Sequence, residues 1–432
     1  MGMRVLVVGS GAREHALCWR LATEGAQLVI CTPGNPLMSD VAEVHADVRL
    51  GDREAIVALA VAERVDLVVV GPEAPLVEGL VDRLTAAGIP AFGPSAAAAQ
   101  LEASKAFARE ICRAASVPMA VGAAFDAVAP AMEYAEMLGA PLVVKADGLA
   151  AGKGVAICAG LDDAERAVRE AIEHGRFGDS GRRVIVEELL EGVEASVICI
   201  CDGREAVLLP AARDHKRLLD GDLGPNTGGM GAFSPIPGLD DTALLRLRDE
   251  IFIPVLIEME RRDTPFRGAL FAGLMLTADG PRVLEFNARL GDPETQTLLP
   301  RLGQPITPLL FASATGSLSE FAAHADIIKT NREAAVALTL ATHGYPDDPR
   351  SGDAIAGIEV ARAAGALVFG AGVRLDDRGA LITAGGRVMS VVGRGADLAS
   401  AADVAYEAAD LIGFAGKQIR RDIGRSLVGA SA

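Results

Sequence analysis

Lysine is scarce in this chain, and its positions point to the binding of phosphate groups. Six lysines occur in 432 residues, and four of them fall between residues 105 and 216. Lys145 ends an apolar run, and Lys153 stands in the glycine-rich stretch 148–154. Glycines let a backbone approach phosphates closely, and ammonium groups neutralise them. We therefore predict a polyphosphate site, although Gly154 after Lys153 excludes a Walker A loop.

A carboxylate and an amide alternate on a later predicted strand. Glu285 and Asn287 are two residues apart, so their side chains face the same way. Two oxygen donors at this spacing suit Mg²⁺, which takes few protein ligands and completes its coordination with phosphate oxygens. Arg289 and Asp292 follow directly. Because an arginine here could stabilise an anionic transition state, the segment 285–296 predicts a metal–nucleotide site.

Adjacent carboxylates end another apolar run. Glu187 and Glu188 close the run, and Glu194 follows a short turn. Like charges at neighbouring positions repel unless a ligand or partner uses them, and the amine and hydroxyls of a purine nucleoside could do so. A solvated acidic turn is the alternative, and the pattern alone does not separate the two.

The first strand pattern ends in a glycine turn that leads into a helix. The turn reads Gly9-Ser-Gly11, and Arg13 and Glu14 follow. A dinucleotide fingerprint would need a third glycine and an acidic residue after the second strand, and both are missing. Free N–H groups at a helix start suit a phosphate monoester better. A turn that only packs the helix on the strand is the alternative.

The stretch 214–238 is rich in glycine, proline and asparagine and shows no core pattern, so we predict a long loop there. Loops of this length in a compact domain are usually functional or disordered. Its backbone N–H groups could contact small anions. His215 alone is weak support for acid–base chemistry.

Three regions of different character must position these residues. Strand and helix patterns alternate through the first hundred residues, which predicts a parallel sheet with helices on both faces and includes a helix over 75–87. The middle region predicts a mostly antiparallel α+β fold with one long helix over 240–262. The tail predicts short strands and a helix over 397–413. We therefore predict domains at 1–103, 104–325 and 326–432.

Composition excludes several classes of protein. Half of the residues are hydrophobic and 23% are charged, which excludes disorder over most of the chain. A net charge of −17 argues against nucleic acid and anionic membranes as partners. No apolar run reaches the ~20 residues of a membrane span. Six cysteines without a CxxC pair predict reduced thiols in the cytoplasm and no structural zinc.

Taken together, the motifs resemble the phosphoribosylamine–glycine ligase family over essentially the whole chain. The matching segments are Gly9–Ala16, Gly71–Pro75, Lys145–Gly154, Asp214–Arg217, Gly224–Gly231 and Glu285–Gln296. The resemblance implies an ATP-grasp architecture: a biotin-carboxylase-like N-terminal domain with a parallel sheet, a central ATP-grasp domain with a mobile lid at about 120–192, and a small β-rich C-terminal domain. It implies ATP-dependent joining of phosphoribosylamine and glycine in purine biosynthesis, through glycyl phosphate.

The resemblance also implies roles for residues on the nucleotide side. Phosphates of ATP would be held by Lys105, Lys145 and Lys153. The adenine would lie against Glu187, Glu188 and Leu190, and the ribose against Glu194. Mg²⁺ or Mn²⁺ would be bound by Glu285 and Asn287, and the transferring phosphoryl group would be steadied by Arg289 with Lys153.

The remaining implied roles concern glycine and phosphoribosylamine. The implied contacts are Gly9, Gly11, Arg13, Glu14, Asn35, Glu73, Asp214, Lys216 and Asp292, with Asp214 on the glycine amine. Ala12 in the first turn and Pro36-Leu37 after Asn35 depart from the family pattern. The tail also departs from it over 369–372, so no catalytic residue is assigned there.

Three other functions compete with this interpretation. They are an ATP-grasp ligase or carboxylase acting on another acid, a nicotinamide dehydrogenase, and a non-catalytic nucleotide-binding scaffold. The missing third glycine argues against the dehydrogenase, and the intact set of lysines, carboxylates and amide argues against the scaffold. We expect small-molecule partners and a monomer or weak dimer.

Overall fold

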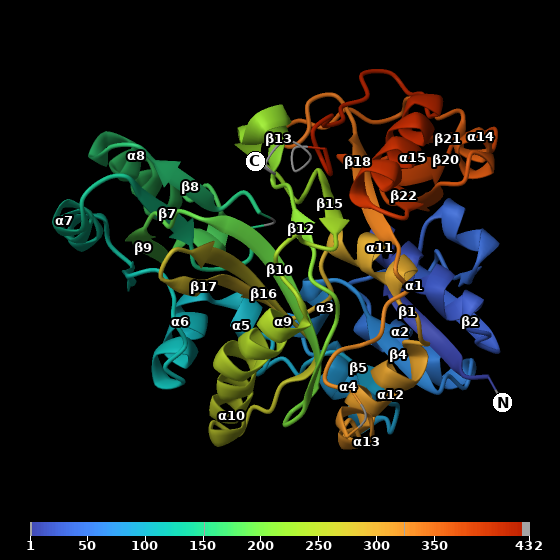
Figure 1. Ribbon diagram of the computed structural model, residues 1–432, viewed down its shortest axis with the longest axis horizontal. Coiled ribbons are helices and arrows are strands. Elements are labelled where there is room, and N and C mark those ends of the chain that lie inside the picture. Colours follow the sequence, from blue (N-terminus) through green and yellow to red (C-terminus); the bar gives the residue numbers. More distant parts are fainter. Residues whose placement is uncertain (1, 151, 324, 426–432) are drawn as a thin grey trace.

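The computed structural model describes residues 2–150, 152–323 and 325–425. Figure 1 shows a parallel sheet at one side of the molecule and an antiparallel sheet at its centre. A small sheet projects from the molecule, and a further antiparallel sheet lies above the parallel sheet. The structure confirms the predicted fold class, which mixes a parallel α/β part with antiparallel α+β parts. None of the described helices combines the length and apolarity needed to cross a bilayer.

The N-terminal part is a five-stranded parallel sheet in the order β3-β2-β1-β4-β5. Apolar β-branched runs form its buried strands, and the turn after β1 opens directly into the first helix. The predicted helix over 75–87 is two helices, because Gly79 adopts a left-handed φ of 82° between them. The elements are β1 Arg4–Gly9, α1 Ala12–Thr23, β2 Leu28–Pro33, β3 Glu43–Val44, α2 Arg53–Ala62, β4 Leu67–Val70, α3 Glu73–Val77, α4 Leu80–Ala86 and β5 Ala91–Phe92.

The projecting sheet has four strands in the order β6-β9-β7-β8, and every neighbouring pair is antiparallel. Two helices pack on it and bury a small apolar core of their own. Ala151, in the predicted lid loop, lies outside the described residues. The elements, after α5 Gln100–Ala103 and α6 Lys105–Ala114, are β6 Gly122–Phe125, α7 Val128–Leu138, β7 Leu142–Ala146, β8 Val155–Cys158, α8 Leu161–Ile172 and β9 Val184–Glu188.

The central sheet has the order β11-β10-β16-β17 and is antiparallel throughout. The helix predicted over 240–262 is divided by a wider turn at Arg248–Phe252 into α9 and α10. Its elements are β10 Val193–Asp202, β11 Ala206–Leu208, α9 Asp241–Leu247, α10 Ile253–Arg261, β16 Arg267–Thr277 and β17 Gly280–Asn287. Because β17 ends at Asn287, its carboxyl end carries Glu285 and Asn287 toward the middle of the molecule.

The fourth sheet joins segments that are far apart in the sequence, in the order β12-β15-β18-β22-β19. The prediction of one long loop over 214–238 is wrong, because it contains a hairpin and most of two strands of this sheet. β15 was missed because it is only four residues long and its partner β18 lies about a hundred residues later. These elements are β12 Arg213–Asp214, β13 Arg217–Leu219, β14 Leu223–Asn226, β15 Gly231–Ser234, β18 Ala334–Ala341, β19 Leu367–Gly370 and β22 Arg387–Gly395.

Helices pack on the fourth sheet and on the N-terminal part. α15 (Leu398–Leu411) packs on β22 and β18, and α14 (Ile358–Ala363) packs on α15. α11 (Glu294–Leu298) lies against α1, and α12 (Thr307–Thr315) lies against β5, so the segment after β17 returns to the N-terminal sheet. The short strands β20 Val373–Leu375 and β21 Leu381–Thr383 form a separate hairpin, and α13 spans Ser319–Ala322.

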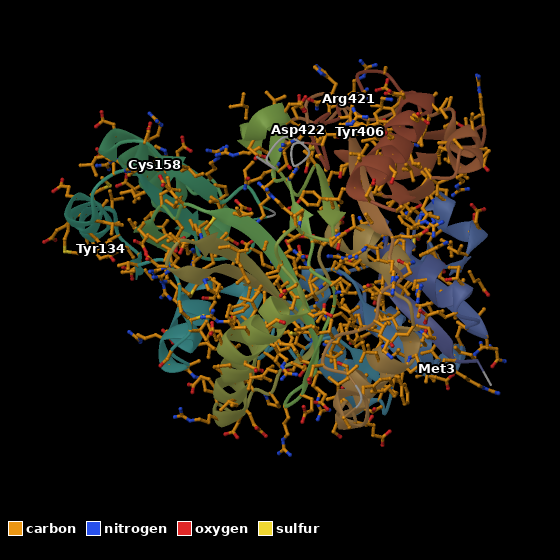
Figure 2. All side chains as sticks on the ribbon, viewed as in Figure 1. Met3, Tyr134, Cys158, Tyr406, Arg421 and Asp422 are labelled. Carbon is orange, nitrogen blue, oxygen red and sulfur yellow. The ribbon has the colours of Figure 1, made fainter. Side chains whose placement is uncertain are left out.

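The last described residues hold the β13–β14 hairpin in place. Arg420 is buried, and its guanidinium donates to Asp222 in the hairpin at 2.7 Å and to Asp422 at 2.6 Å. Asp422 in turn accepts a hydrogen bond from the backbone N–H of Gly221 at 2.9 Å. Figure 2 shows Asp422 close to Arg421 and Tyr406 at this end of the molecule. The C-terminal segment therefore supports a hairpin that lies next to the candidate site.

Candidate active site

One cavity of about 780 Å³ collects nearly all of the residues that the sequence singles out. Its walls come from the glycine turn after β1, the projecting sheet, the carboxyl end of β17 and the segment around β12. All of the predicted site residues except Lys153 and Asn35 line it: Gly9, Gly11, Arg13, Glu14, Glu73, Lys105, Lys145, Glu187, Glu188, Leu190, Glu194, Asp214, Lys216, Glu285, Asn287, Arg289 and Asp292. The fold therefore brings together segments almost three hundred residues apart.

Lys145 lies at the junction of the projecting and central sheets. Its Nζ is 2.5 Å from Glu187 Oε1 and donates to the carbonyl of Leu284 at 3.0 Å. Glu187 also accepts from Arg109 at 2.9 Å, so two cations offset the repulsion between Glu187 and Glu188. Arg109 has no distinguishing signal in the sequence, where it looks like an ordinary charged residue of an amphipathic helix. Lys145 and Arg109 therefore place two cationic groups at this wall that could neutralise phosphates.

Lys153 contacts the C-terminal domain across the mouth of the site. Its Nζ donates to the carbonyl of Pro346 at 2.8 Å. One residue earlier, the carbonyl of Gly152 accepts from Asn226 at the end of β14, at 2.9 Å. These two contacts join the described part of the loop 148–154 to elements on the opposite side of the cavity.

Glu285 and Asn287 share one face of β17, as predicted from their spacing. Glu285 pairs with Lys216 at 2.9 Å, and this cation lowers the pKa of Glu285 to about 2 although burial opposes the shift. Asn287 Oδ1 accepts from Arg289 at 3.2 Å. An ionised carboxylate and an amide oxygen fit a divalent cation that also takes phosphate oxygens. Among the described residues, no three His, Cys, Asp or Glu side chains form a metal cluster.

Arg289 is held between two carboxylates. Its Nε donates to Glu73 at 3.3 Å, and its Nη2 lies 3.1 Å from Glu102 Oε1. Burial favours the neutral form of Glu73, but Arg289 and Arg13 lower its pKa overall. Burial raises the pKa of Glu102 against the opposing effect of Arg289. Glu102 could not be predicted as a site residue, since nothing in its local sequence pattern distinguishes it.

Asp214 has an unsatisfied carboxylate beside the cavity. Its Oδ1 is buried and accepts no hydrogen bond from a described residue. Burial raises its pKa well above the usual range, and the nearby Glu294 raises it further. Glu294 is itself buried and accepts from the hydroxyl of Ser196 at 2.8 Å. A cationic ligand would satisfy the free oxygen and offset the charge of both acids.

The glycine turn is filled by one carboxylate. Glu14 Oε2 accepts from the backbone N–H of Gly11 at 2.8 Å, and Glu14 Oε1 accepts from Arg13 at 2.6 Å. A Cβ on Gly9 would lie 2.5 Å from Glu14 Cγ, and one on Gly11 would lie 2.7 Å from Glu14 Oε2. Glycine at these positions therefore leaves room for a buried acid rather than only forming a tight turn.

Asn35 is occupied by contacts within the protein. Its Nδ2 donates to the carbonyls of Ser10 at 2.8 Å and Gly370 at 2.9 Å, and its Oδ1 accepts from Leu37 N–H at 3.0 Å. Nearby, His15 Nδ1 accepts from Gly370 N–H at 2.9 Å, and burial lowers the pKa of His15 to about 3. Asn35 and the neutral His15 thus tie the glycine turn to β19.

The tail contributes a cavity residue that sequence analysis did not assign. Arg387, the first residue of β22, lines the cavity and pairs with Asp292. It also donates to the carbonyl of Gly228 at 2.6 Å. Burial acts to raise the pKa of Asp292, but Arg387 and Arg13 lower it overall, so the acid stays ionised. The two glycines before Arg387 were the available sequence signal, since they let the backbone approach another segment.

Comparison with known proteins agrees with this geometry. Models of three phosphoribosylglycinamide synthetase domains match residues 3–102 (N domain), 103–295 (ATP-grasp domain) and 335–426 (C domain). The phosphoribosylamine–glycine ligase of Caulobacter vibrioides is 46% identical over 423 residues, which is 98% of each chain. That of Streptomyces coelicolor is 47% identical over 99% of this chain and all of the relative.

The chain belongs to the phosphoribosylamine–glycine ligase family. A solved family member, the ligase from Thermotoga maritima, matches 97% of this chain and all of its own with a TM-score of 0.84 and 32% identity. Biotin carboxylase from Campylobacter jejuni matches 98% of this chain and 95% of its own with a TM-score of 0.70. At 17% identity that likeness shows the fold alone, and it confirms the predicted biotin-carboxylase-like, ATP-grasp architecture. Membership of a ligase family argues against the dehydrogenase and the scaffold.

Proposed function

We propose that this chain joins glycine to 5-phosphoribosylamine, forming glycinamide ribonucleotide while ATP is converted to ADP and phosphate, in purine biosynthesis. The proposal rests on one cavity that contains three kinds of chemical group. Lys145 donates to the carbonyl of Leu284 near the carboxyl end of β17, Asp214 has a free carboxylate oxygen, and the glycine turn lines the same cavity. ATP, an amino acid and a sugar phosphate require these three environments in contact.

The projecting sheet and its loop form the proposed ATP site. Lys105, Lys145 and Lys153 bind the phosphates, and Glu187, Glu188 and Leu190 hold the adenine, while Glu194 binds the ribose. Glu188 already accepts the N–H of Val121 at 2.8 Å, which fixes its carboxylate at the cavity wall. Burial lowers the pKa of Lys105, and a bound phosphate would raise the pKa of that amine again.

Glu285 and Asn287 are the residues that would hold a divalent cation, and we propose Mg²⁺ or Mn²⁺. Such an ion neutralises phosphate charge and orients the nucleotide when bound. The chain's own part is to keep Glu285 ionised and both oxygens on one face of β17. The 2.9 Å ion pair with Lys216 keeps Glu285 ionised, and the alternation of side chains along the strand places both oxygens on one face.

The proposed first step activates glycine. A carboxylate oxygen of glycine attacks the γ-phosphorus of ATP, the bond to the bridging oxygen breaks, and ADP leaves with that electron pair. The product is glycyl phosphate, whose phosphate is a good leaving group. Asp214 holds the glycine ammonium, and Arg289 with Lys145 and Lys153 neutralises the charge of the transferring group.

The proposed second step forms the amide. The amine of phosphoribosylamine attacks the carbonyl carbon of glycyl phosphate, a C–N bond forms, and the C–O bond to phosphate breaks. The proton lost by the amine leaves with the released phosphate as hydrogen phosphate. The sugar phosphate lies at the glycine turn, with Gly9, Gly11, Arg13 and Glu14, and against Glu73, Asp292 and Lys216. Asn35 supports this turn rather than contacting the substrate, because its amide is engaged on both sides.

Two measurements test the proposed function. ADP release should require both glycine and phosphoribosylamine, and omission of either should reduce it to background. Glycine labelled with ¹⁸O in its carboxylate should pass one labelled oxygen to the released phosphate. ADP release that needs another acid would replace glycine as the substrate, and label that stays wholly in the amide would rule out the acyl phosphate.

A further inference from the structure

Glu102 lies outside the motifs of the site but is built into its centre. It belongs to the short helix α5, which precedes the projecting sheet, and its side chain is only 6% exposed. Oε2 accepts the backbone N–H of Ala288 at 2.7 Å, and Oε1 lies 3.1 Å from Nη2 of Arg289. Both carboxylate oxygens therefore contact the two residues that directly follow Asn287.

These contacts define the position of Arg289 more strictly than its other partners do. The Glu73 carboxylate lies 3.3 Å from Nε and its side chain is 31% exposed, so it is the more adjustable partner. A hydrogen bond to a carboxylate, such as the one from the Ala288 N–H, is stronger than one between neutral groups, and burial limits the rotamers available to Glu102. The same carboxylate also fixes Ala288, so the guanidinium and the end of β17 move together.

We propose that Glu102 is the positioning residue that sets Arg289 and the end of β17 at the geometry required for phosphoryl transfer. The inference rests on the proposed function. Arg289 must meet the charge that develops on the transferring group, and Asn287 must keep its oxygen on the cation side. Displacements of about 1 Å in such groups can slow a reaction about a hundredfold. A residue that contacts no substrate thereby limits the rate.

The decisive variant is Glu102→Gln. Its amide oxygen can still accept from Ala288, but its N–H₂ then faces the Arg289 guanidinium, so donor meets donor. We expect kcat to fall roughly 10–100-fold, with KM for ATP and for glycine within about twofold of the wild type. Glu102→Asp keeps the charge and shortens the side chain, and we expect an intermediate kcat.

Glu258→Gln is the matched control. Glu258 is also a buried glutamate, and it pairs with Arg261 and Arg262, each at 2.8 Å, on α10 away from the cavity. A similar loss of melting temperature in both variants, with loss of kcat only in Glu102→Gln, supports positioning. Equal kcat losses in the two variants, or a change confined to KM, would overturn it.

A crystal structure of Glu102→Gln provides a readout independent of turnover. We expect the Arg289 guanidinium to leave its place beside Asn287, and an unmoved guanidinium would overturn the proposal. The wild type is assayed in parallel for ADP release that depends on glycine and phosphoribosylamine. Failure of that assay counts against the proposed function, whereas an active wild type with a fully active Glu102→Gln counts against the role of Glu102.

Discussion

The guanidinium of Arg387 contacts both the backbone and the side chain of Asp292. The guanidinium Nη1 donates to the Asp292 carbonyl at 3.1 Å, and Nη2 donates to Oδ2 at 3.0 Å. Arg387 begins β22 of the C-terminal sheet, whereas Asp292 follows β17 of the central sheet. The C-terminal domain therefore determines the shape of a cavity wall that lies in another part of the chain.

Arg387→Ala should impair use of the substrates other than ATP. Asp292 and the carbonyl of Gly228 lose their donor, and charged hydrogen bonds contribute about 1.5–3 kcal/mol each. We expect kcat/KM for phosphoribosylamine or glycine to fall at least tenfold while ATP affinity changes little. Steady-state kinetics with each substrate varied, and calorimetry with ATP, provide the measurement. Arg374→Ala, an exposed arginine of the same domain, is the control.

Lys153→Ala should weaken ATP use without unfolding the chain. The variant loses the contact to Pro346 and the cation that we propose to bind phosphate, so we expect the loop to close less tightly over the nucleotide. We expect a higher KM for ATP and slower turnover at an unchanged melting temperature. Lys329→Ala, also an exposed lysine substitution but away from the loop, should match the wild type. Unchanged kinetics of Lys153→Ala would remove this lysine from the site.

Glu285→Ala should abolish turnover, whereas Asn287→Asp should keep part of it with an altered metal preference. The aspartate still offers an oxygen donor, while the alanine removes the ionised carboxylate. Because the pKa of Glu285 is about 2, metal affinity should not change between pH 5 and pH 8 through this residue. Titrations with Mg²⁺ and Mn²⁺ across that pH range measure the metal affinity. Full activity of Glu285→Ala would exclude the residue from the mechanism.

Gly11→Val should block phosphoribosylamine and spare ATP. A Cβ at this position would meet Glu14 Oε2 at 2.7 Å, so the buried carboxylate must move and the turn must open. We expect calorimetry to show unchanged ATP affinity and kinetics to show a loss of turnover that added phosphoribosylamine does not restore. Lost ATP affinity would contradict the separation of the two sites.

Asp214→Asn should stabilise the protein without ligand but weaken its binding of glycine. The folded-state pKa of Asp214 is raised by burial, so its contribution to stability is full below the unfolded value and declines as pH rises. The apo variant should therefore be more stable than the wild type near neutral pH. Its KM for glycine should rise at least tenfold, since the amide cannot pair with an ammonium. In the wild type, KM for glycine should fall as pH rises and Asp214 ionises.

The elements that the sequence predicted well have strong local signals. The apolar runs that end at Lys145 and at Glu187-Glu188 are the strands β7 and β9 in the structure, and the helix predicted over 397–413 is α15, Leu398–Leu411. Lys145, Glu187, Glu188, Glu285 and Asn287 were found because they stand at or near the ends of predicted strands, whereas other cavity residues, such as Lys105, Leu190 and Glu73, were assigned through the family resemblance. In a sheet the ends of neighbouring strands meet, so local motifs predict a shared site.

The elements that were missed depend on distant partners. β15 is four residues long and becomes a strand by pairing with β18. Glu102 and Arg387 look like solvent-facing charges, and their roles come from Ala288 and Asp292, which are 186 and 95 residues away in the sequence. Patterns within a short window contain no information on such contacts. The prediction of one helix over 75–87 was wrong for a different reason. Gly79 adopts a left-handed conformation that divides the helix, and the residues around it give no sign of this break.

The pairing of β15 with β18, and of β18 with β22, has a consequence for the order of folding during translation. Asp214 lies in β12, and Lys216 follows it, at the edge of a sheet whose remaining strands are synthesised later. A nascent chain has no β18 to pair with β15 until residues 334–341 have left the ribosome, and no β22 to pair with β18 until residues 387–395 have left it. The parallel N-terminal sheet can form early, but the cavity becomes complete only when nearly the whole chain has emerged.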